Sequence, residues 1–429
     1  MREFIRRIQF VSAFPALNDF IDRHFGTAAF NKFIKLICTP FRYVFGFLCM
    51  LYRKFKSEKG NGKICVVAIA KNESDYIAEW AAFHKTVGFD HIFLYDNDST
   101  DGMQDKLKGF VDSGFVTVKK IPGQGQQLNA YNDAVRLHRD EYEWMAFIDC
   151  DEFLMPEAKG QPIASILESF IKKDNAIGGV AVNWCVYGSS GFAKKPDGLL
   201  IENFVWRAKT NGGRGNECIK TIARSMSIQY FQHPHYPVYK SGYYPVNTQM
   251  KLVPEWSSSL KDSYILLRIN HYFTKSKEQW IKRRSLGRAP LGANHKRSLE
   301  EFYLHDNNDV EDKHGVEYAA EVKELLLAML AKEQADYRED YQLISHSDLF
   351  DAAWYLKQNP DVEKHKMDPV EHYLKFGWKE GRDPSPKFSG KMYLESYNDV
   401  REAHINPLLH YEKLGRKESR HIFSSVAKC

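Results

Sequence analysis

Two acidic residues one position apart, Asp149 and Asp151, follow the apolar segment 144–148. In an extended segment, side chains at positions i and i+2 project to the same side, so we expect both carboxylates to face one point. Two carboxylates this close repel each other, and a divalent cation that prefers oxygen ligands, Mn2+ or Mg2+, removes the conflict. Such an ion would neutralise the charge that grows on a departing diphosphate. The alternative is a solvated turn that only ends the strand, because a lone acid-x-acid pattern is common by chance.

Polar residues also follow two earlier apolar segments. Segment 64–70 is followed by Lys71, Asn72 and Glu73, and segment 91–95 by Asp96, Asn97, Asp98 and Asp101. Carboxylates and amides at a strand end suit a ribose diol or the edge of a base, although the same composition is typical of an ordinary turn. We expect these residues to line one crevice together with the acidic pair.

Apolar runs alternate with amphipathic segments from residue 64 onward. Strands are predicted at 64–70, 91–95, 116–121 and 144–148, and helices at 74–87 (capped by Ser74), 103–112 and 126–138. The alternation predicts an α/β fold with a mostly parallel sheet. Ligands bind such sheets at the C-terminal ends of the strands, which is where the polar groups described above lie.

The composition of the 429-residue chain is that of an ordinary soluble protein, with 43% hydrophobic and 27% charged residues. The net charge of +5 is unevenly placed, since residues 1–60 carry eleven Lys and Arg against four Asp and Glu. The body of the chain is slightly acidic, which argues against a nucleic-acid binder with a broad basic face. The seven cysteines show no Cys-x-x-Cys spacing, so neither a disulfide framework nor a zinc cluster is predicted, and a reducing, cytoplasmic setting is expected.

The basic N-terminal segment, residues 1–60, contains a stretch at 33–52 in which aromatic and aliphatic residues are interrupted by Lys35, Pro40 and Arg42. The stretch is as long as a membrane span, but the interruptions favour a segment that lies on an anionic membrane surface. A helix pair packed on the domain that follows is the alternative. A segment lying on the membrane surface would place the protein peripherally on the inner face of the membrane.

The remaining chain is predicted to form three parts. Residues 62–305 form the α/β domain, in which 176–285 has the pattern of strands and long loops, and 306–345 form a helical connector. Residues 346–429 hold two helical copies of one unit, offset by 38 residues.

The two copies match at many positions. The matched pairs include Tyr355 with Tyr393, Pro369 with Pro407, His372 with His410, and Gly377 with Gly415. Each proline follows a capping residue and marks a helix start. The repeated histidines lack metal-ligand spacing, so we expect them to pack.

Several motifs together resemble those of family 2 and family 92-like glycosyltransferases. They are Lys71-Asn-Glu-Ser74, Tyr95-Asp-Asn-Asp-Ser-Thr-Asp-Gly102, Ala130-Tyr-Asn-Asp-Ala134, Phe147-Ile-Asp-Cys-Asp-Glu-Phe-Leu154, Lys220-Thr-Ile-Ala-Arg224 and Ile269-Asn-His-Tyr-Phe-Thr-Lys-Ser276. The tandem C-terminal unit resembles repeats attached to bacterial glycosyltransferases. The resemblance implies the GT-A fold, a Rossmann-like sandwich with a metal-dependent Asp-x-Asp motif.

The resemblance also implies roles for individual residues. The donor would be bound by Lys71, Asn72, Glu73, Asp96, Asp98, Asp101 and Asn132, and the metal by Asp149, Asp151 and His271. The alternative for His271 is a hydrogen-bonded loop histidine that binds no metal. From their charge we also expect contacts with phosphate oxygens at Lys275, Arg283, Arg284 and Arg288, although such a run of charges is more often a solvated face. His233 and His235 form a weaker candidate pair.

An inverting transfer needs a carboxylate that takes the proton of the acceptor hydroxyl. Glu217, in a glycine-rich loop, and Glu152, beside the metal motif, are the two candidates, and Glu217 also fits a loop acid in solvent. We expect a metal-dependent glycosyltransferase that moves a sugar from a nucleotide-diphosphate sugar donor to a glycan or glycolipid acceptor in bacterial surface polysaccharide synthesis. The alternatives are a sugar-nucleotidyltransferase, which would favour a glycine-rich phosphate loop after the first strand, and a non-catalytic glycan-binding protein.

Overall fold

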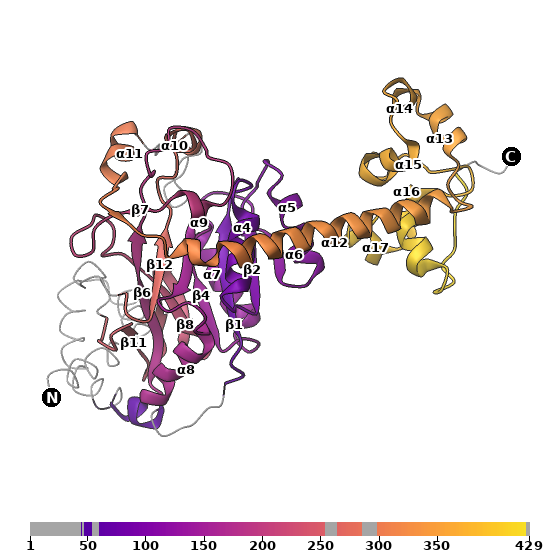
Figure 1. The fold of residues 1–429 in the computed structure, drawn as a ribbon. Coiled ribbons are helices and arrows are strands. Elements are labelled where there is room, and N and C mark those ends of the chain that lie inside the picture. The colour runs from indigo at the N-terminus through magenta and orange to yellow at the C-terminus, as the bar shows by residue number, and fades with distance from the viewer. Residues whose placement is uncertain (1–43, 45–46, 54–59, 254–263, 285–297, 426–429) are drawn as a thin grey trace, which may run out of the picture. The chain divides into compact units, whose positions relative to one another are not determined.

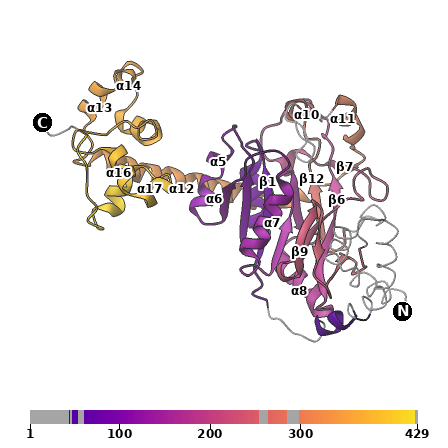
Figure 2. The ribbon, with the colours of Figure 1, turned by 180° about the vertical axis from the view of Figure 1, so that it is seen from behind.

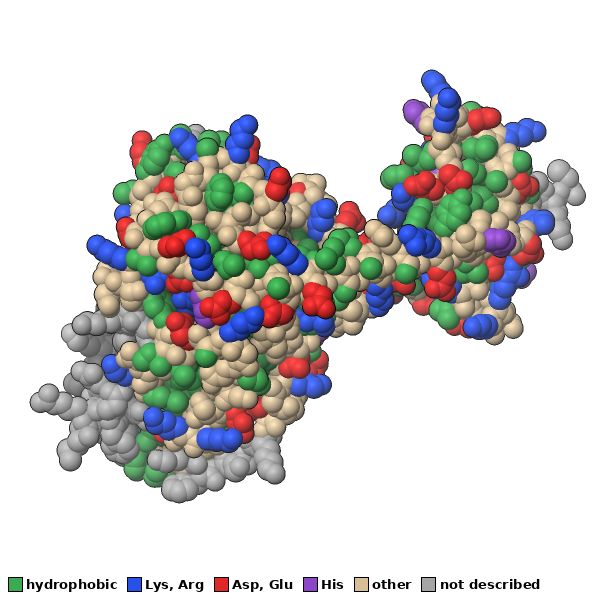
Figure 3. Space-filling view, in the orientation of Figure 1, with side chains coloured by type: hydrophobic (Ala, Val, Ile, Leu, Met, Phe, Trp, Pro, Cys, Tyr) green, Lys and Arg blue, Asp and Glu red, His purple; other side chains and the backbone are tan. Residues whose placement is uncertain are grey.

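The computed structural model describes residues 44, 47–53, 60–253, 264–284 and 298–425 (Figure 1). The chain divides into two compact units, Met1–Leu327 and Ala328–Cys429. The predicted N-terminal segment, residues 1–60, lies almost wholly outside the described residues. Across the described residues, no helix is both long and apolar enough to cross a membrane. On the face shown in Figure 3, acidic and basic side chains are interspersed over both units.

The first unit is built on a mixed sheet, which confirms the predicted α/β class. Its described strands lie in the order β3-β2-β1-β4-β8-β6-β12-β5, and β11 pairs with β6. The parallel part consists of β1 (Ile64–Ala70), β2 (His91–Asp96), β3 (Val116–Lys120) and β4 (Trp144–Phe147). The remaining strands are β5 (Glu152–Pro156), β6 (Ile177–Val186), β8 (Ile219–Arg224), β11 (Tyr244–Asn247) and β12 (Leu267–His271). Strand β8 is antiparallel to both β4 and β6.

The parallel strands form because their apolar runs are buried between layers of helix. Helix α7 (Gln127–His138) covers one face and packs Tyr131 and Val135 against core residues of β1, β2 and β4 (Figure 2). Helix α4 (Ile77–Thr86) is tied to β5, where the indole N–H of Trp80 donates to the carbonyl of Glu152 (2.8 Å). The two helices fix the positions of the loops that follow β1 and β4.

Two predicted helix boundaries are wrong. Helix α4 begins at Ile77 without a side-chain cap, and Ser74 lies in the preceding loop, where its backbone N–H donates to Asp101 (2.9 Å). The predicted helix at 103–112 is two short helices, α5 (Met103–Lys106) and α6 (Lys108–Asp112). The break lies at Leu107, and Gly109, a poor helix former, is in the first turn of α6.

The strand order places a switch point beside β1. Strand β1 pairs with β2 on one side and with β4 on the other, so the chain runs outward to β3 and then returns to the opposite side of β1. A crevice forms where the loops after β1 and β4 diverge, which is where open α/β sheets bind ligands.

Shorter elements complete the first unit. They are α8 (Ile163–Lys173), α9 (Leu200–Asn203), β7 (Trp206–Arg207), η1 (Ser225–Ser227), β9 (Ile228–His233), β10 (Tyr236–Tyr239), α10 (Lys277–Arg284), α11 (Leu299–His305), β13 (Val310–Glu311) and η3 (Gly315–Tyr318). Strand β13 pairs with β7, and β9 pairs with β10. Segment 176–285 is therefore mainly strands and loops, with short helices at α9 and α10.

Helix α12 (Ala319–Ser345) crosses the division between the two units. The second unit then holds α13 (Ala352–Gln358), α14 (Pro360–Lys364), α15 (Pro369–His372) and η4 (Tyr373–Gly377), followed by α16 (Gly390–Ser396), α17 (Asn398–Glu402), α18 (Pro407–His410) and η5 (Tyr411–Gly415).

The two sets of helices carry equivalent buried contacts. The hydroxyl of Tyr355 is 2.9 Å from Nδ1 of His372, and that of Tyr393 is 3.1 Å from Nδ1 of His410. All four side chains are buried, so the repeated histidines lie in packed, hydrogen-bonded positions. The predicted domain boundaries in residues 306–345 stay predictions.

Candidate active site

A cavity of about 1000 Å3 opens at the C-terminal ends of β1, β2 and β4, at the switch point of the strand order. Its walls come from the loops after these strands, from β8 and from α10 and α11. The predicted site residues that line it are Lys71, Asn72, Glu73, Asp98, Asp101, Asp149, Asp151 and His271. Residues far apart in the sequence are therefore brought to one place by the sheet.

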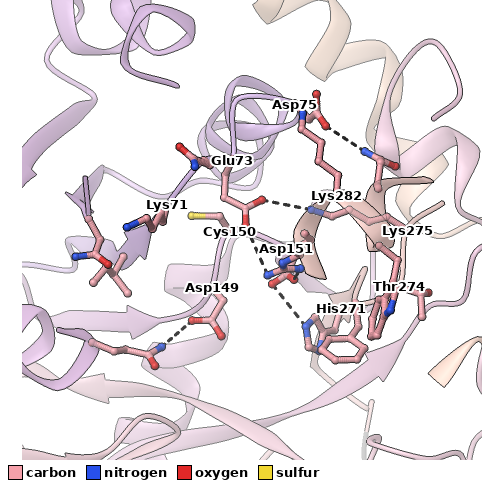
Figure 4. A pocket seen from close by; sticks show the side chains of 18 of the residues that line it. Lys71, Glu73, Asp75, Asp149, Cys150, Asp151, His271, Thr274, Lys275 and Lys282 are labelled. Atoms are coloured by element: carbon pink, nitrogen blue, oxygen red, sulfur yellow. Dashed lines mark hydrogen bonds and ion pairs between the residues drawn. The ribbon is translucent and has the colours of Figure 1, made fainter. Parts of the chain in front are cut away.

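The acidic pair stands in a tight turn between β4 and β5, where the backbone N–H of Glu152 donates to the carbonyl of Asp149 (3.1 Å). The prediction of an extended segment is wrong here, because the chain must reverse to enter β5. Both Asp149 and Asp151 still line the cavity. They point to different neighbours (Figure 4).

Asp149 is held by two side chains from other elements. Its Oδ1 accepts a hydrogen bond from Nε2 of Gln127 on α7 (2.9 Å), and its Oδ2 accepts one from Nζ of Lys220 on β8 (2.9 Å). Lys220 is also 3.8 Å from Oε1 of Glu152. Burial works to lower the pKa of Lys220, but the carboxylates of Asp149 and Glu152 overcome it and hold the pKa above its usual value. Lys220 is therefore a buried, permanently charged partner of Asp149.

Asp151 has a different set of partners. Nη1 of Arg283, on α10, donates to its Oδ2 (2.6 Å), and Nε2 of His271, at the end of β12, lies 3.6 Å from its Oδ1. Asp151 is almost fully buried. Burial works to raise its pKa, yet the Arg283 guanidinium and the His271 ring hold that pKa well below the usual range. Asp151 is therefore an ionised carboxylate at the cavity wall.

Glu73 extends this network on the opposite side of the turn (Figure 4). Its carboxylate is 3.4 Å from Nζ of Lys275 and 3.5 Å from Nη2 of Arg283. Two acidic side chains, Glu73 and Asp151, thus share the Arg283 guanidinium. The arrangement concentrates both signs of charge around one part of the cavity, as a site for a charged ligand requires.

The loops after β1 and β2 are hydrogen bonded to each other. Asn72 and Asp98 both have left-handed backbone conformations, with φ of 57° and 58°. The side chain of Asn72 accepts from the backbone N–H of Thr100 (2.8 Å), and Asp98 accepts from that of Gly123 (3.1 Å). Both conformations are sparsely populated for residues with a side chain. The hydrogen bonds between the loops hold both side chains at the cavity.

Four predicted site residues do not line the cavity, namely Asp96, Asn132, Glu152 and Glu217. Asp96 is buried and accepts from Gln104 (2.6 Å), while Asn132 is hydrogen bonded to both backbone groups of Phe231. These two residues brace the loop after β2 and the contact between α7 and β9. The side chains of Asp96 and Asn132 therefore make hydrogen bonds within the fold and do not face the cavity.

Neither candidate base reaches the cavity. Glu152 is fully buried, accepts from the backbone N–H of Asp149 (3.0 Å), and has a pKa that burial raises well above its usual value. Glu217 accepts from the backbone N–H of Gly215 (2.9 Å) within its own loop. From that loop it is Arg214 that lines the cavity. The geometry therefore assigns the role of base to neither glutamate.

The predicted metal ligands are only partly brought together. Among the described residues, no three His, Cys, Asp or Glu side chains form a group that could hold a metal ion. Asp151 and His271 do converge, and Asp149 turns to Lys220 instead. One carboxylate and one imidazole facing a cavity fit a cation that takes its other ligands from water and phosphate oxygens, as Mg2+ does in many phosphate sites.

Sequence reasoning gave no role to Gln127 or Lys220, which both contact Asp149. The sequence carried no clear signal for Lys220, because the segment Ile219–Arg224 mixes apolar with polar residues and lysine is rarely buried. His235 also lines the cavity, and burial, with the nearby Lys220, lowers its pKa to about 3. Its Nδ1 donates to the carbonyl of Ile219 (2.8 Å), so the neutral ring carries its acceptor on Nε2.

Comparison with known families bears on this site directly. Residues 63–251, which include the loops after β1, β2 and β4, match the sequence model of glycosyltransferase family 92. The resemblance predicted from the motifs is confirmed. Family 92 proteins of Arabidopsis thaliana and Oryza sativa subsp. japonica are 25% and 28% identical to this chain over 162 and 157 residues.

These matches cover 35% and 36% of this chain, and 28% and 26% of the two family 92 proteins. The chain thus spans about a quarter of the length of the relatives it matches.

Solved structures with some similarity include Staphylococcus aureus TarS 1–349 in complex with UDP, at 14% identity and a TM-score of 0.28, covering 83% of this chain and 89% of that chain. Another is the glucosyl-3-phosphoglycerate synthase of Mycobacterium tuberculosis with phosphoglyceric acid, at 18% identity and a TM-score of 0.21, covering 28% of this chain and 44% of that chain. Likenesses this low carry no inference about individual residues.

Proposed function

We propose that this chain is a glycosyltransferase that takes a sugar from a nucleotide-diphosphate sugar donor, with Mn2+ or Mg2+ bound at Asp151 and His271. The observation that carries the proposal is the cavity at the switch point of a family 92-like domain, where Asp151 and His271 converge beside Lys275 and Arg283. A crevice of this kind, lined by an ionised carboxylate and by cations, suits a diphosphate with its counter-ion.

Different described residues would contact different parts of the donor. Asn72 and Asp98, which line the cavity and are hydrogen bonded to neighbouring loops, would contact the ribose and base. Arg283 and Lys275 are placed to donate to phosphate oxygens. When bound at Asp151 and His271, the divalent cation supplies neutralisation of the negative charge on the diphosphate.

The transfer itself forms one bond and breaks one. The acceptor hydroxyl oxygen bonds to the anomeric carbon, the bond from that carbon to the diphosphate oxygen breaks, and the nucleoside diphosphate leaves with the electron pair. The acceptor proton passes to a base. We propose an inverting course, with a glycan or glycolipid acceptor of bacterial surface polysaccharide synthesis, a finer assignment supported by the motif resemblance and by the tandem C-terminal unit.

A manganese-supplemented screen of nucleotide-sugars by thermal shift tests the donor class. A true donor at a hundredfold its dissociation constant stabilises the protein by about 2.7 kcal/mol. A screen in which no nucleotide-sugar raises the melting temperature contradicts the proposal.

Turnover of that donor tests the site. In Asp151→Asn we expect turnover to fall at least about 100-fold with the circular dichroism unchanged, because neutralising a departing group is worth several kcal/mol. Asp133→Asn, which removes a carboxylate on α7 that is 22% exposed and lies outside the cavity lining, is the matched control and should leave turnover unaltered. A non-catalytic glycan-binding protein would show no manganese-dependent donor hydrolysis and unaffected glycan binding in Asp151→Asn.

A further inference from the structure

The two acids of the turn are paired with cations of different kinds. Lys220, the partner of Asp149, is only 1% exposed and lies in the middle of the sheet on β8. Arg283, the partner of Asp151, has 27% of its side chain exposed and lies near the end of α10. Both pairs line the cavity, but in the first pair the cation is the buried partner, whereas in the second pair the cation is the partly exposed one.

The Arg283 guanidinium occupies the oxygen that a cation would need. Its Nη1 is 2.6 Å from Oδ2 of Asp151, while Nε2 of His271 lies 3.6 Å from the other oxygen, Oδ1. A dication coordinated by Asp151 would therefore stand within a few ångströms of the guanidinium. Two positive charges at that separation repel strongly in a partly buried site.

Arg283 has other negative groups to move to. It is already within 3.5 Å of Glu73, and its planar fork of donors matches the geometry of phosphate oxygens. A diphosphate in the cavity offers such oxygens next to Asp151. The same side chain can thus pair with the protein before the ligands bind and with the ligand afterwards.

We propose that Arg283 holds the place of the divalent cation on Asp151 in the metal-free protein, and transfers to the diphosphate when cation and donor bind. This inference rests on the proposed function. Its consequence is that metal and nucleoside diphosphate bind cooperatively. The cation alone must displace Arg283 without compensation, whereas the cation with a diphosphate gives the displaced guanidinium a new partner.

The coupling must be reciprocal. If the nucleoside diphosphate raises the affinity for Mn2+ by some factor, then Mn2+ raises the affinity for the nucleotide by the same factor. This equality needs no assumption about the acceptor or the rate of transfer. It can be measured on the resting protein by calorimetry, without turnover.

Arg283→Gln tests the proposal. MnCl2 is titrated into the full chain alone and with a saturating amount of UDP or GDP, whichever binds more tightly. In the wild type we expect weak Mn2+ binding that the nucleotide strengthens. In Arg283→Gln we expect Mn2+ alone to bind at least about tenfold more tightly, the low end of coupling between close charge pairs, and the enhancement by the nucleotide to shrink.

Two further variants separate the effect of the Arg283 charge from other effects of substitution. Arg283→Lys retains the charge and should keep the weak metal binding of the wild type, which separates the loss of charge from a loss of folding. Arg136→Gln, an exposed arginine on α7 that pairs with Asp133, is the matched control and should behave as the wild type.

An affinity for Mn2+ that is equal in Arg283→Gln and wild type, with equal enhancement by nucleotide, overturns the inference while leaving the metal-dependent transferase in place. Absence of any Mn2+ binding, with or without nucleotide, overturns the inference together with the metal dependence of the proposed function. In that case donor turnover without metal decides whether the transferase assignment itself survives.

Discussion

Replacing Lys220 by methionine should destabilise the first unit more than its single hydrogen bond suggests. At an effective dielectric constant of 20, the attraction across the 2.9 Å between Nζ of Lys220 and Oδ2 of Asp149 is about 6 kcal/mol before desolvation is subtracted. Removing one partner of a buried pair typically costs about 3–5 kcal/mol, because the other charge stays behind without compensation. The side chain of Asp149 is 35% exposed and so partly screened by water, which places the expected loss at about 3 kcal/mol.

Urea unfolding and differential scanning calorimetry measure this loss. At roughly 2 °C per kcal/mol for a domain of this size, the melting temperature of Lys220→Met should fall by about 6 °C. Lys119→Met is the matched control, since Lys119 pairs with Asp133 at 2.5 Å but is 49% exposed, and exposed pairs contribute about 0–1 kcal/mol.

The double variant Lys220→Met with Asp149→Asn should recover at least about 1 kcal/mol, because residues of one ion pair are not additive. If Lys220→Met costs no more than Lys119→Met, or if the two site substitutions are simply additive, the reasoning from buried charge is refuted.

Two other predictions concern parts of the fold away from the cavity. Glu79 is buried and accepts from the backbone N–H groups of Leu200 (2.7 Å) and Ile201 (3.0 Å), and burial raises its pKa to about 7. The stability that the protonated Glu79 contributes is complete below the unfolded pKa near 4.5 and is lost as pH rises toward 7. Between pH 5 and pH 8 the unfolding free energy should therefore fall by about 2.5 kcal/mol more in the wild type than in Glu79→Gln. Parallel pH profiles of the two proteins would contradict this. In the second unit, a Cβ on Gly377 would lie 2.0 Å from the hydroxyl of the buried Tyr355, so Gly377→Ala should cost about 2 kcal/mol by overpacking and speed hydrogen exchange over residues 348–425. Unchanged exchange in that variant would show that the glycine is not required by this contact.

The elements around the site were predictable because their signals are local. The apolar run Ile64–Ala70 is a strand within its predicted bounds, and the amphipathic pattern of α7 also gave a helix that ends at the predicted residue. Ser74 was predicted to begin a helix but lies in the loop before α4, where its backbone N–H donates to Asp101, 27 residues away. A pattern within one segment cannot reveal a partner in another.

The same limit applies to the site. The turn Asp149-Cys150-Asp151 was identified at the right place, and its acids do face the cavity, but the extended geometry assumed for it was wrong. Glu152 was a candidate base because it adjoins the acidic pair in the sequence, whereas in the fold it is fully buried, with Lys220 of β8 3.8 Å from its carboxylate. Its pKa is raised by that burial and could not be judged from the turn alone.

What the sequence determined by itself is the alternation of strands and helices from Ile64 to Phe147 and the polar residues at the strand ends, since backbone propensity, side-chain alternation and turn chemistry act between close neighbours along the chain. Only the tertiary structure decided which acidic side chain pairs with which basic side chain. Lys220 reaches Asp149 because β8 runs antiparallel to β4, and Arg283 reaches Asp151 across 132 residues because α10 follows β12 to the cavity. Electrostatic interactions act through space, and only the folded sheet sets those distances.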